Sequence, residues 1–442
     1  MYFSSTVHKN PPVLFKDAIL RCLPEEGGLY VPETLADLRP FFLHMGEETT
    51  YQEMAAAVAP LLFEGDLNPL SAARVAKSAF TFDPELIQLD ETFSVLNLYN
   101  GPTGIFKDFG AAFLAALLEE LLRGGKTGKT SEAMVISAAR GNSGVSIARA
   151  FENREGIVTA LLYPNEPILG LKKAGYLSQG GNVIPIRVRG GLDDCQKLIG
   201  EVIYDRPFAE RYQVTSANAI NPGRLLPQSF YFLYSFIKLK KRISGELMFS
   251  IPSGNFGNLI AGLYAWKFGM PVNGYIVAMN MNNSFSEFLK GEAPADIKPR
   301  ALVPTVSPAL DVIRPSNRER LMAFYESAPA VMRNMVFPES VDDETTIAAM
   351  EKAWIRYGIH LDPHGAVAYA AAERMAANRD FNGHIVILAT GHPAKYSDLA
   401  ARVSGERLVT PERLASLGQE AEPAAEIEPD LEGLESAIAA CF

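Results

Sequence analysis

The chain has 442 residues, of which 48% are apolar and 21% charged, which is enough apolar material for two or three folded domains. Its formal net charge of −10 argues against nucleic acid or an anionic membrane as a partner. The cysteines at positions 22, 195 and 441 have the spacing of neither a disulfide framework nor a zinc site. We therefore expect reduced thiols, no metal and a cytoplasmic location, since the sequence shows neither a signal peptide pattern nor a membrane-spanning apolar run.

Residues 1–92 predict a small N-terminal domain that is mostly helical, because LADLRPFFLHM and YQEMAAAVAPLLF have the apolar spacing of helices. In residues 93–400, short apolar runs alternate with helical patterns. The runs that predict buried strands are 133–138, 157–164, 246–252, 273–280 and 383–390. Uninterrupted apolar strands alternating with helices predict an α/β fold with parallel sheets flanked by helices.

Two later segments fit this pattern less well. Residues 290–340 are rich in proline, and we interpret them as an insertion or flap within the catalytic region. Residues 401–442 predict a helical C-terminal segment with an acidic tail, which we expect to lie at the surface.

The stretch GPTGIFKDFG (101–110) places Lys107 between two phenylalanines, at the entrance of a predicted buried helix. An apolar site disfavours the ammonium form of lysine, so this setting suits an amine that loses its proton near neutral pH. The alternative is a structural lysine that extends to solvent or pairs with Asp108.

The stretch PSGNFGN (252–258) follows a predicted strand and opens a helix. Gly254 and Gly257 allow backbone N–H groups to approach an anion, and the helix dipole favours negative charge there. A plain strand-to-helix turn is the alternative. ARGNSG (139–144) is a second turn of this kind, with Arg140 and Asn142 as polar side chains.

SANAINPGRLLPQ (216–228) places Asn218, Asn221 and Arg224 near the start of an aromatic-rich helix. An arginine there suits a phosphate or a carboxylate, although an ion-paired surface arginine is equally compatible with the pattern. DPHGAVA (362–368) and ATGHPAK (389–395) contribute His364 and Thr390. The acidic VDDETT (341–346) indicates a helix N-terminus rather than a metal site.

Together these segments resemble the threonine synthase family over roughly residues 1–430. The family comprises pyridoxal-phosphate enzymes of the tryptophan-synthase β-subunit fold class, fold type II. GPTGIFKDFG resembles the lysine motif of the family, and PSGNFGN resembles its cofactor-phosphate loop. SANAINPGRLLPQ, VDDETT, DPHGAVA and ATGHPAK are similar to segments that follow in the same order in family members.

The resemblance implies a lyase of threonine biosynthesis that converts O-phospho-L-homoserine and water to L-threonine and phosphate, acting as a monomer or homodimer. Lys107 would hold pyridoxal phosphate as a Schiff base and afterwards move protons on the substrate. The other residues implied at the cofactor are Asn142, Gly254, Asn255, Phe256, Gly257, Asn258 and Thr390. Those implied at the substrate are Arg140, Ser143, Asn218, Asn221 and Arg224.

Three departures from the family pattern fall in substrate-facing loops: AARGNSG in place of TSGDTG, Leu169-Gly170 in place of Ser-Pro, and Ala219 in place of serine. They leave open a paralogue that acts on another γ-substituted amino acid, or one that eliminates phosphate to give a 2-oxo acid. A non-catalytic amino-acid-binding protein on the same fold is a further alternative. The presence of Lys107 and of the complete PSGNFGN loop weighs against it.

Overall fold

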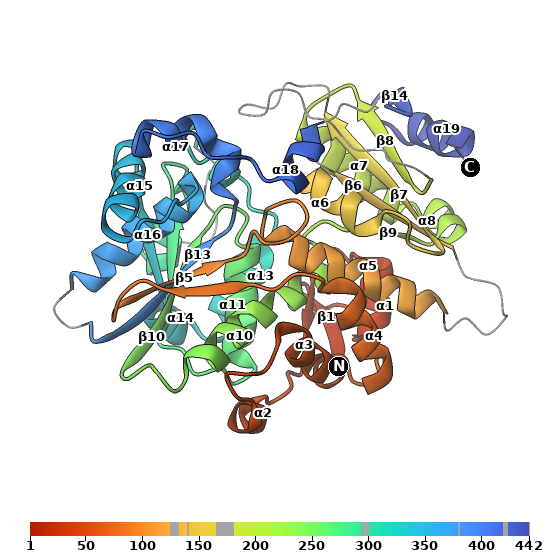
Figure 1. Ribbon diagram of the computed structural model, residues 1–442. Coiled ribbons are helices and arrows are strands. Elements are labelled where there is room, and N and C mark those ends of the chain that lie inside the picture. The colour runs from red at the N-terminus through yellow and green to blue at the C-terminus, as the bar shows by residue number, and fades with distance from the viewer. Residues whose placement is uncertain are drawn as a thin grey trace.

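The structure is a computed structural model that describes residues 1–123, 132–138, 141–164, 181–292, 297, 300–378, 381–418 and 423–441. The described strands form three sheets, of three, six and five strands. The two larger sheets belong to separate lobes, on the left and right of Figure 1, and the N-terminal segment lies below them. No helix in these ranges is long and apolar enough to span a membrane.

The N-terminal segment combines helices with a small antiparallel sheet that the sequence did not predict. Its helices are α1 (Phe15–Arg21), α2 (Arg39–His44), α3 (Tyr51–Leu62) and α4 (Pro69–Ala79), and its strands are β1 (Tyr2–Ser5), β2 (Val13–Leu14) and β3 (Tyr30–Pro32). Thr50 and Glu53 form a capping box that starts α3. Both predicted helices of this segment are confirmed as α2 and α3.

The first lobe is built on the six-stranded sheet, in the order β12-β11-β10-β13-β5-β4. The strands are β4 (Glu85–Gln88), β5 (Phe93–Asn97), β10 (Glu246–Pro252), β11 (Gly274–Met279), β12 (Val336–Ser340) and β13 (Gly383–Ala389). Neighbouring strands are parallel except β4, which pairs antiparallel with β5. The three runs predicted here as strands are therefore confirmed as β10, β11 and β13.

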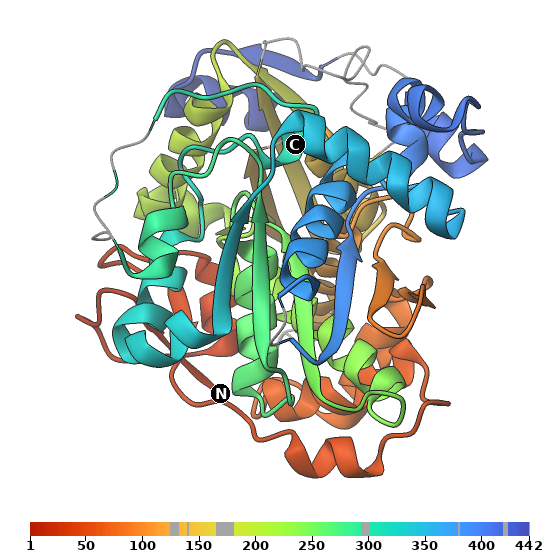
Figure 2. The same ribbon diagram turned by 90° about the vertical axis from the view of Figure 1, so that its left-hand side faces the viewer.

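Helices cover both faces of this sheet. Leu247 and Phe249 of β10 pack with α10 (Ser229–Leu239) and α11 (Gly257–Lys267), while Met248 packs with α16 (Pro363–Ala376) on the opposite face. Figure 2 shows α15 (Asp343–Tyr357) and α16 in front of the sheet. Because successive side chains of a strand point to opposite faces, burial on both sides requires the continuous apolar runs seen in the sequence.

The second lobe is built on the five-stranded sheet, in the order β14-β8-β7-β6-β9, with all neighbouring strands parallel. Its strands are β6 (Ala133–Ala138), β7 (Ile157–Pro164), β8 (Val183–Val188), β9 (Val214–Thr215) and β14 (Ala425–Ile427). Its helices are α6 (Asn142–Phe151), α7 (Leu192–Tyr204), α8 (Arg206–Tyr212) and α19 (Leu431–Cys441). The predicted strands 133–138 and 157–164 agree with β6 and β7 residue for residue.

The C-terminal tail belongs to the second lobe instead of lying on its surface as expected. Strand β14 extends the sheet beside β8, and α19 buries Leu434 and Ile438 completely. These two apolar side chains, four positions apart, share one helix face, and the surrounding acidic residues obscured that pattern in the sequence.

Part of the segment interpreted as an insertion or flap is integral to the first lobe. It contains α13 (Arg318–Ser327), α14 (Pro329–Met335) and the edge strand β12, preceded by α12 (Ser286–Lys290). Leu321 and Met332 are fully buried in the main apolar core. Residues 318–340 therefore form helices and a strand of the first lobe. Within 290–340, the interpretation as an insertion or flap can apply only to residues before 318.

The remaining helices connect the lobes and complete the chain: α5 (Lys107–Arg123), α9 (Pro222–Leu225), α17 (Ser397–Ser404) and α18 (Glu412–Ala415). Helix α5 is buried along most of its length and packs against α4, α6 and α9. Its first residue, Lys107, is thereby held at the junction of the two lobes.

The packing of α19 predicts that the Leu434→Ala variant loses about 2–5 kcal/mol of unfolding free energy, because a fully buried leucine leaves a cavity. Leu43→Ala is the control, since Leu43 is 81% exposed and its truncation should change stability by less than about 0.5 kcal/mol. Urea unfolding of both variants measures the difference. Equal stability of the two variants would show that α19 does not contribute to the core.

Candidate active site

A cavity of about 350 Å³ lies between the two lobes. Its size falls within the range of roughly 300–1,000 Å³ that is typical of small-molecule sites. Pro252 and Thr390, at the carboxyl ends of β10 and β13, line one side, and Ala138 at the end of β6 lines the other. Ligands of parallel α/β sheets bind at such strand ends.

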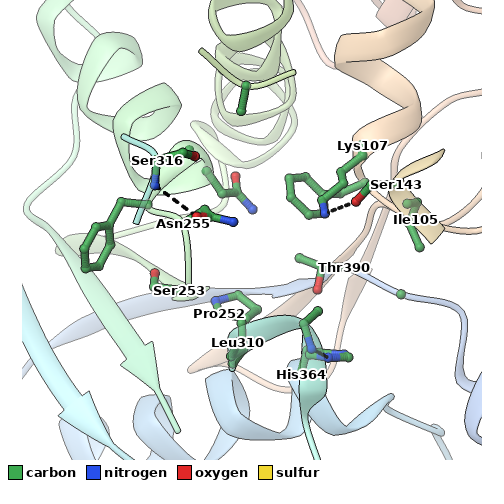
Figure 3. A pocket seen from close by; sticks show the side chains of 18 of the residues that line it. Ile105, Lys107, Ser143, Pro252, Ser253, Asn255, Leu310, Ser316, His364 and Thr390 are labelled. Carbon is green, nitrogen blue, oxygen red and sulfur yellow. Dashed lines mark hydrogen bonds between the residues drawn. The ribbon is translucent and has the colours of Figure 1, made fainter. Parts of the chain in front are cut away.

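Lys107 extends into this cavity from the first turn of α5. Its Nζ donates a hydrogen bond to Ser143 Oγ, 2.6 Å away on α6 (Figure 3). Burial, with the positive charges of Arg224 and Lys395, lowers the pKa of Lys107 to about 8. Roughly one lysine in ten is then neutral at pH 7, against far fewer for an ordinary lysine with a pKa near 10.4.

Asp108, the neighbour of Lys107, is engaged with other groups. Its carboxylate accepts hydrogen bonds from the backbone N and Oγ1 of Thr103, at 2.8 and 2.5 Å, and from Ser146 Oγ at 2.7 Å. Burial raises the pKa of this carboxyl group. Asp108 therefore anchors the loop before α5 to α6, and the bond that Lys107 makes is to a neutral hydroxyl.

The loop 253–258 forms the end of the cavity opposite Lys107, as Figure 3 shows for Ser253 and Asn255. Phe256 adopts a left-handed conformation, with φ of 58°, and α11 begins at the next residue. Asn255 Oδ1 accepts a hydrogen bond from the backbone N of Ser316 at 3.0 Å. The loop thus presents the N-terminus of an eleven-residue helix to the cavity.

The two glycines of this loop have different surroundings. A Cβ on Gly254 would lie 3.1 Å from Ala309 O and from Leu310 Cα, so a side chain there would force the neighbouring backbone to shift slightly. A Cβ on Gly257 would meet its nearest protein atom, Asn317 Nδ2, at 3.4 Å, which is an ordinary contact. A side chain at position 257 is therefore compatible with the fold but would occupy space at the head of α11.

Two hydrogen-bond donors without acceptors belong to residues that line the cavity. Arg224 Nε and Asn258 Nδ2 are buried and have no partner among the described residues. Arg224 is 3% exposed, burial lowers its pKa to about 10, and its Nη1 donates to Ala217 O. Unsatisfied donors beside a helix N-terminus fit an anionic group such as the phosphate of a cofactor or substrate.

Thr390 lies below Lys107 in Figure 3, directly after β13. Its carbonyl oxygen accepts a hydrogen bond from the backbone N of Phe106 at 2.9 Å, which ties the end of β13 to the segment that carries Lys107. His364 lies below it, with Nδ1 bonded to Asp362 Oδ2 and Nε2 accepting from the backbone N of Ala309 at 3.1 Å.

The candidate substrate residues with described side chains form two groups. Ser143, Asn218 and Arg224 line the cavity, but the Asn218 side chain also pairs with the backbone N and O of Ala138, at 3.0 and 2.9 Å. Asn221 does not line it. Its fully buried carboxamide bonds to Ile19 O, Thr215 Oγ1, Ser216 O and the N of Gly223, so its role in the structure is to hold α1 against α9.

Several predicted positions cannot be placed in the cavity. Arg140, Ala139, Leu169 and Gly170 lie outside the described residues, and the described part of Asn142 is its backbone at the start of α6.

Other lining residues had no motif to indicate them. Gln196 of α7 and Leu310 and Ser316 of the loop before α13 line the cavity. Lys395, noted in the sequence only as part of ATGHPAK, also lines it, and burial lowers its pKa to about 8. Their positions depend on the packing of segments that are distant in sequence.

A buried lysine with a lowered pKa faces a strand-to-helix loop across a cavity between two sheet-based lobes, an arrangement that suits a pyridoxal-phosphate-dependent enzyme. Comparison with known proteins supports this class. The family model described as pyridoxal-phosphate dependent enzyme matches residues 88–391. The models for the threonine synthase N terminus and C-terminal region match residues 2–80 and 365–438.

Curated relatives agree along nearly the whole chain. Threonine synthases of Haemophilus influenzae and Escherichia coli (strain K12) are 31% and 32% identical, each over 92% of both chains. Among solved structures, threonine synthase from Escherichia coli matches with a TM-score of 0.87 at 27% identity, over 100% of both chains. The pyridoxal-phosphate-bound enzyme from Brucella melitensis matches with a TM-score of 0.85 at 27% identity, over 100% of this chain and 99% of that one.

The chain belongs to the threonine synthase family of pyridoxal-phosphate-dependent lyases, and its cofactor is pyridoxal phosphate. This confirms the fold class and the cofactor expected from the resemblance.

Because a Cβ fits at position 257, we predict that the Gly257→Ala variant folds normally. It should bind pyridoxal phosphate about tenfold to a hundredfold more weakly, as expected from the loss of a charge-assisted hydrogen bond of roughly 1.5–3 kcal/mol. The matched control is Gly200→Ala in the middle of α7, where a Cβ meets nothing within 4 Å. Absorbance titration of both apoproteins with the cofactor measures the effect. Equal cofactor affinity in both variants would place the phosphate elsewhere.

Proposed function

We propose that this protein converts O-phospho-L-homoserine and water to L-threonine and phosphate. The observation that carries the proposal is the Lys107 amine, with its pKa lowered to about 8, facing a donor-rich loop across one cavity. The membership in the threonine synthase family supports the choice of substrate and product. An elimination that gives a 2-oxo acid would begin with the same steps. Only identification of the product distinguishes it from threonine formation.

When bound, pyridoxal phosphate supplies an electron sink for the charge left on the substrate after deprotonation. Lys107 is proposed to hold the cofactor and then to carry protons at Cα and Cβ of the substrate, for which it must be neutral before each proton is taken. Ser143 Oγ, 2.6 Å from Nζ, orients the amine towards the cavity without holding a proton on it as a carboxylate would.

The remaining cofactor contacts are proposed from the loop and the strand end. The backbone N–H groups of residues 254–258 would bind the cofactor phosphate, and the hydroxyl of Thr390 would contact the pyridine nitrogen. A neutral hydroxyl does not force protonation of that nitrogen. Asn142 would lie near the phenolic oxygen of the cofactor.

For the substrate, we propose Arg224 as the main group that binds the distal phosphate, with Asn218, Ser143 and Arg140 around it. Arg224 remains charged at neutral pH with a pKa of about 10, and its buried Nε lacks an acceptor that a phosphate oxygen would supply. Asn221 is not part of this proposal, because its carboxamide is engaged away from the cavity.

We also propose a division into an N-terminal domain (1–92), a two-lobed catalytic region (93–400) and a C-terminal segment (401–442), of which β14 and α19 complete the second lobe. We further propose a cytoplasmic location, which the free, buried thiols of Cys22 and Cys195 support, and action as a monomer or homodimer.

The substrate proposal predicts that the purified protein, incubated with O-phospho-L-homoserine in ¹⁸O-water, forms threonine with one solvent oxygen in its hydroxyl group. The released phosphate should contain no solvent oxygen, because the Cγ–O bond breaks. Mass spectrometry of both products checks this. Labelled phosphate with homoserine would indicate a phosphatase instead, and 2-oxobutyrate with ammonia would indicate simple elimination.

The lowered pKa of Lys107 predicts that the rate of pyridoxal phosphate uptake by the apoprotein rises about tenfold per pH unit up to about pH 8 and then levels off. The sign follows from burial, which favours the neutral, reactive amine at lower pH than in free lysine. Stopped-flow absorbance measures the rate. Borohydride reduction and peptide mapping should place the pyridoxyl group on Lys107, and a label on another lysine would contradict the assignment.

A further inference from the structure

Three buried side-chain nitrogen atoms of the described residues lack an acceptor. They are Arg224 Nε, Asn258 Nδ2 and Asn317 Nδ2. Arg224 and Asn258 line the cavity, and Asn317 Nδ2 lies 3.4 Å from the position of a Cβ on the lining residue Gly257. Asn317 is fully buried and belongs to none of the motifs recognised in the sequence.

The orientation of the Asn317 carboxamide is determined by its oxygen. Asn317 Oδ1 accepts a hydrogen bond from Arg320 Nη1 at 2.8 Å, so Nδ2 must point the opposite way, towards the head of α11. Asn258 is oriented in the same manner, because its Oδ1 accepts from the hydroxyl of Tyr231 at 2.5 Å. In both residues, Oδ1 accepts a hydrogen bond from the protein and Nδ2 has no acceptor in the described ranges.

Arg320 is itself fixed in place and cannot take the role of the anion-binding group. It is fully buried, and it donates to Tyr30 O at 3.0 Å, Ala219 O at 3.0 Å and Ile220 O at 2.6 Å in addition to Asn317. Nε, Nη1 and Nη2 of its guanidinium each donate to a backbone carbonyl oxygen, and Nη1 also donates to the Asn317 carboxamide oxygen. Its effect at the cavity is transmitted through the carboxamide that it orients.

The loop that carries Asn317 is also fastened to the phosphate loop. The backbone N of the preceding residue, Ser316, donates to Asn255 Oδ1 at 3.0 Å, a bond visible in Figure 3. On the other flank, the backbone N of Ala309 donates to His364. These contacts hold the loop before α13 against α11, so the position of Asn317 relative to Gly257 is rigidly defined.

We propose that Asn317 is a further phosphate-binding residue, whose side-chain Nδ2 donates to a phosphate monoester dianion at the N-terminus of α11. This inference rests on the proposed function insofar as both the cofactor and the proposed substrate carry such a group. Asn258 would donate at the same end of the cavity, and the two asparagine side chains would add donors to the backbone N–H groups of residues 254–258.

The test is the Asn317→Asp variant, which retains the shape of the side chain. Its carboxylate keeps the bond from Arg320 as an ion pair and turns its second oxygen towards the bound phosphate, which it repels. The melting temperature of the apoprotein should be unchanged or higher, while the dissociation constant for the phosphate-bearing ligand that Asn317 contacts rises at least tenfold. A purely structural role would not separate these two measurements in this way.

Two titrations distinguish the sources of the phosphate. If Asn317 binds the cofactor phosphate, the variant loses affinity for pyridoxal phosphate but keeps that for pyridoxal, which lacks the phosphate. If it binds the substrate phosphate, affinity for the cofactor is retained and inorganic phosphate binds the cofactor-loaded protein at least tenfold more weakly. Neither titration requires that threonine be formed, so each can succeed or fail independently of the proposed reaction.

Asn182→Asp is the matched control, since its half-buried Nδ2 donates to Phe151 O at 2.7 Å and Ile157 O at 3.0 Å in the second lobe. It should lower the melting temperature and leave all three affinities unchanged. Asn317→Ala, which removes the donor without adding charge, should raise the affected dissociation constant severalfold and serves if the aspartate variant does not fold. Affinities within twofold of wild type for pyridoxal phosphate and inorganic phosphate in the Asn317 variants would overturn the proposal.

Discussion

The chemistry of the site depends on one contact, the hydrogen bond from Lys107 Nζ to the neutral hydroxyl of Ser143. A carboxylate in that position would stabilise the ammonium form and raise the pKa of the lysine. The nearest acidic neighbour in sequence, Asp108, is instead bonded to Thr103 and Ser146. Burial and the nearby positive charges therefore dominate, and the amine is available at neutral pH.

That contact exists only because two lobes of parallel sheet are joined at their carboxyl ends. Lys107 begins α5, Ser143 belongs to α6 of the second lobe, and the strand end at Thr390 belongs to the first. The bonds from Phe106 N to Thr390 O and between Asn218 and Ala138 fasten these parts together. Residues that the sequence analysis assigned to ligand binding thus include some whose hydrogen bonds also build the cavity.

Two asparagines show that the position of a residue in a sequence motif does not determine its role in the structure. Asn221 lies in a segment that resembles a substrate-binding motif, yet its carboxamide joins α1 to α9 and does not reach the cavity. Asn317 lies in the proline-rich segment for which the sequence predicts an insertion or flap, yet its unpaired Nδ2 is directed at the head of α11. Proline content describes only the local backbone, whereas the burial of Asn317 depends on packing with distant residues, so the sequence did not indicate this position.

The sequence by itself determined the features that depend on local pattern. Continuous apolar runs defined β6, β7 and β10, because a strand buried on both faces needs apolar side chains at every position. The glycines around Phe256 indicated a strand-to-helix turn, and the aromatic neighbours of Lys107 indicated a poorly solvated amine. The tertiary structure alone decided which donors remain unsatisfied, how Asn317 is oriented by Arg320, and that the acidic tail adds β14 and α19 to a sheet. These outcomes depend on contacts between residues far apart in the chain, as between Arg320 and Ala219 or Ile427 and Val188, and no local pattern encodes them.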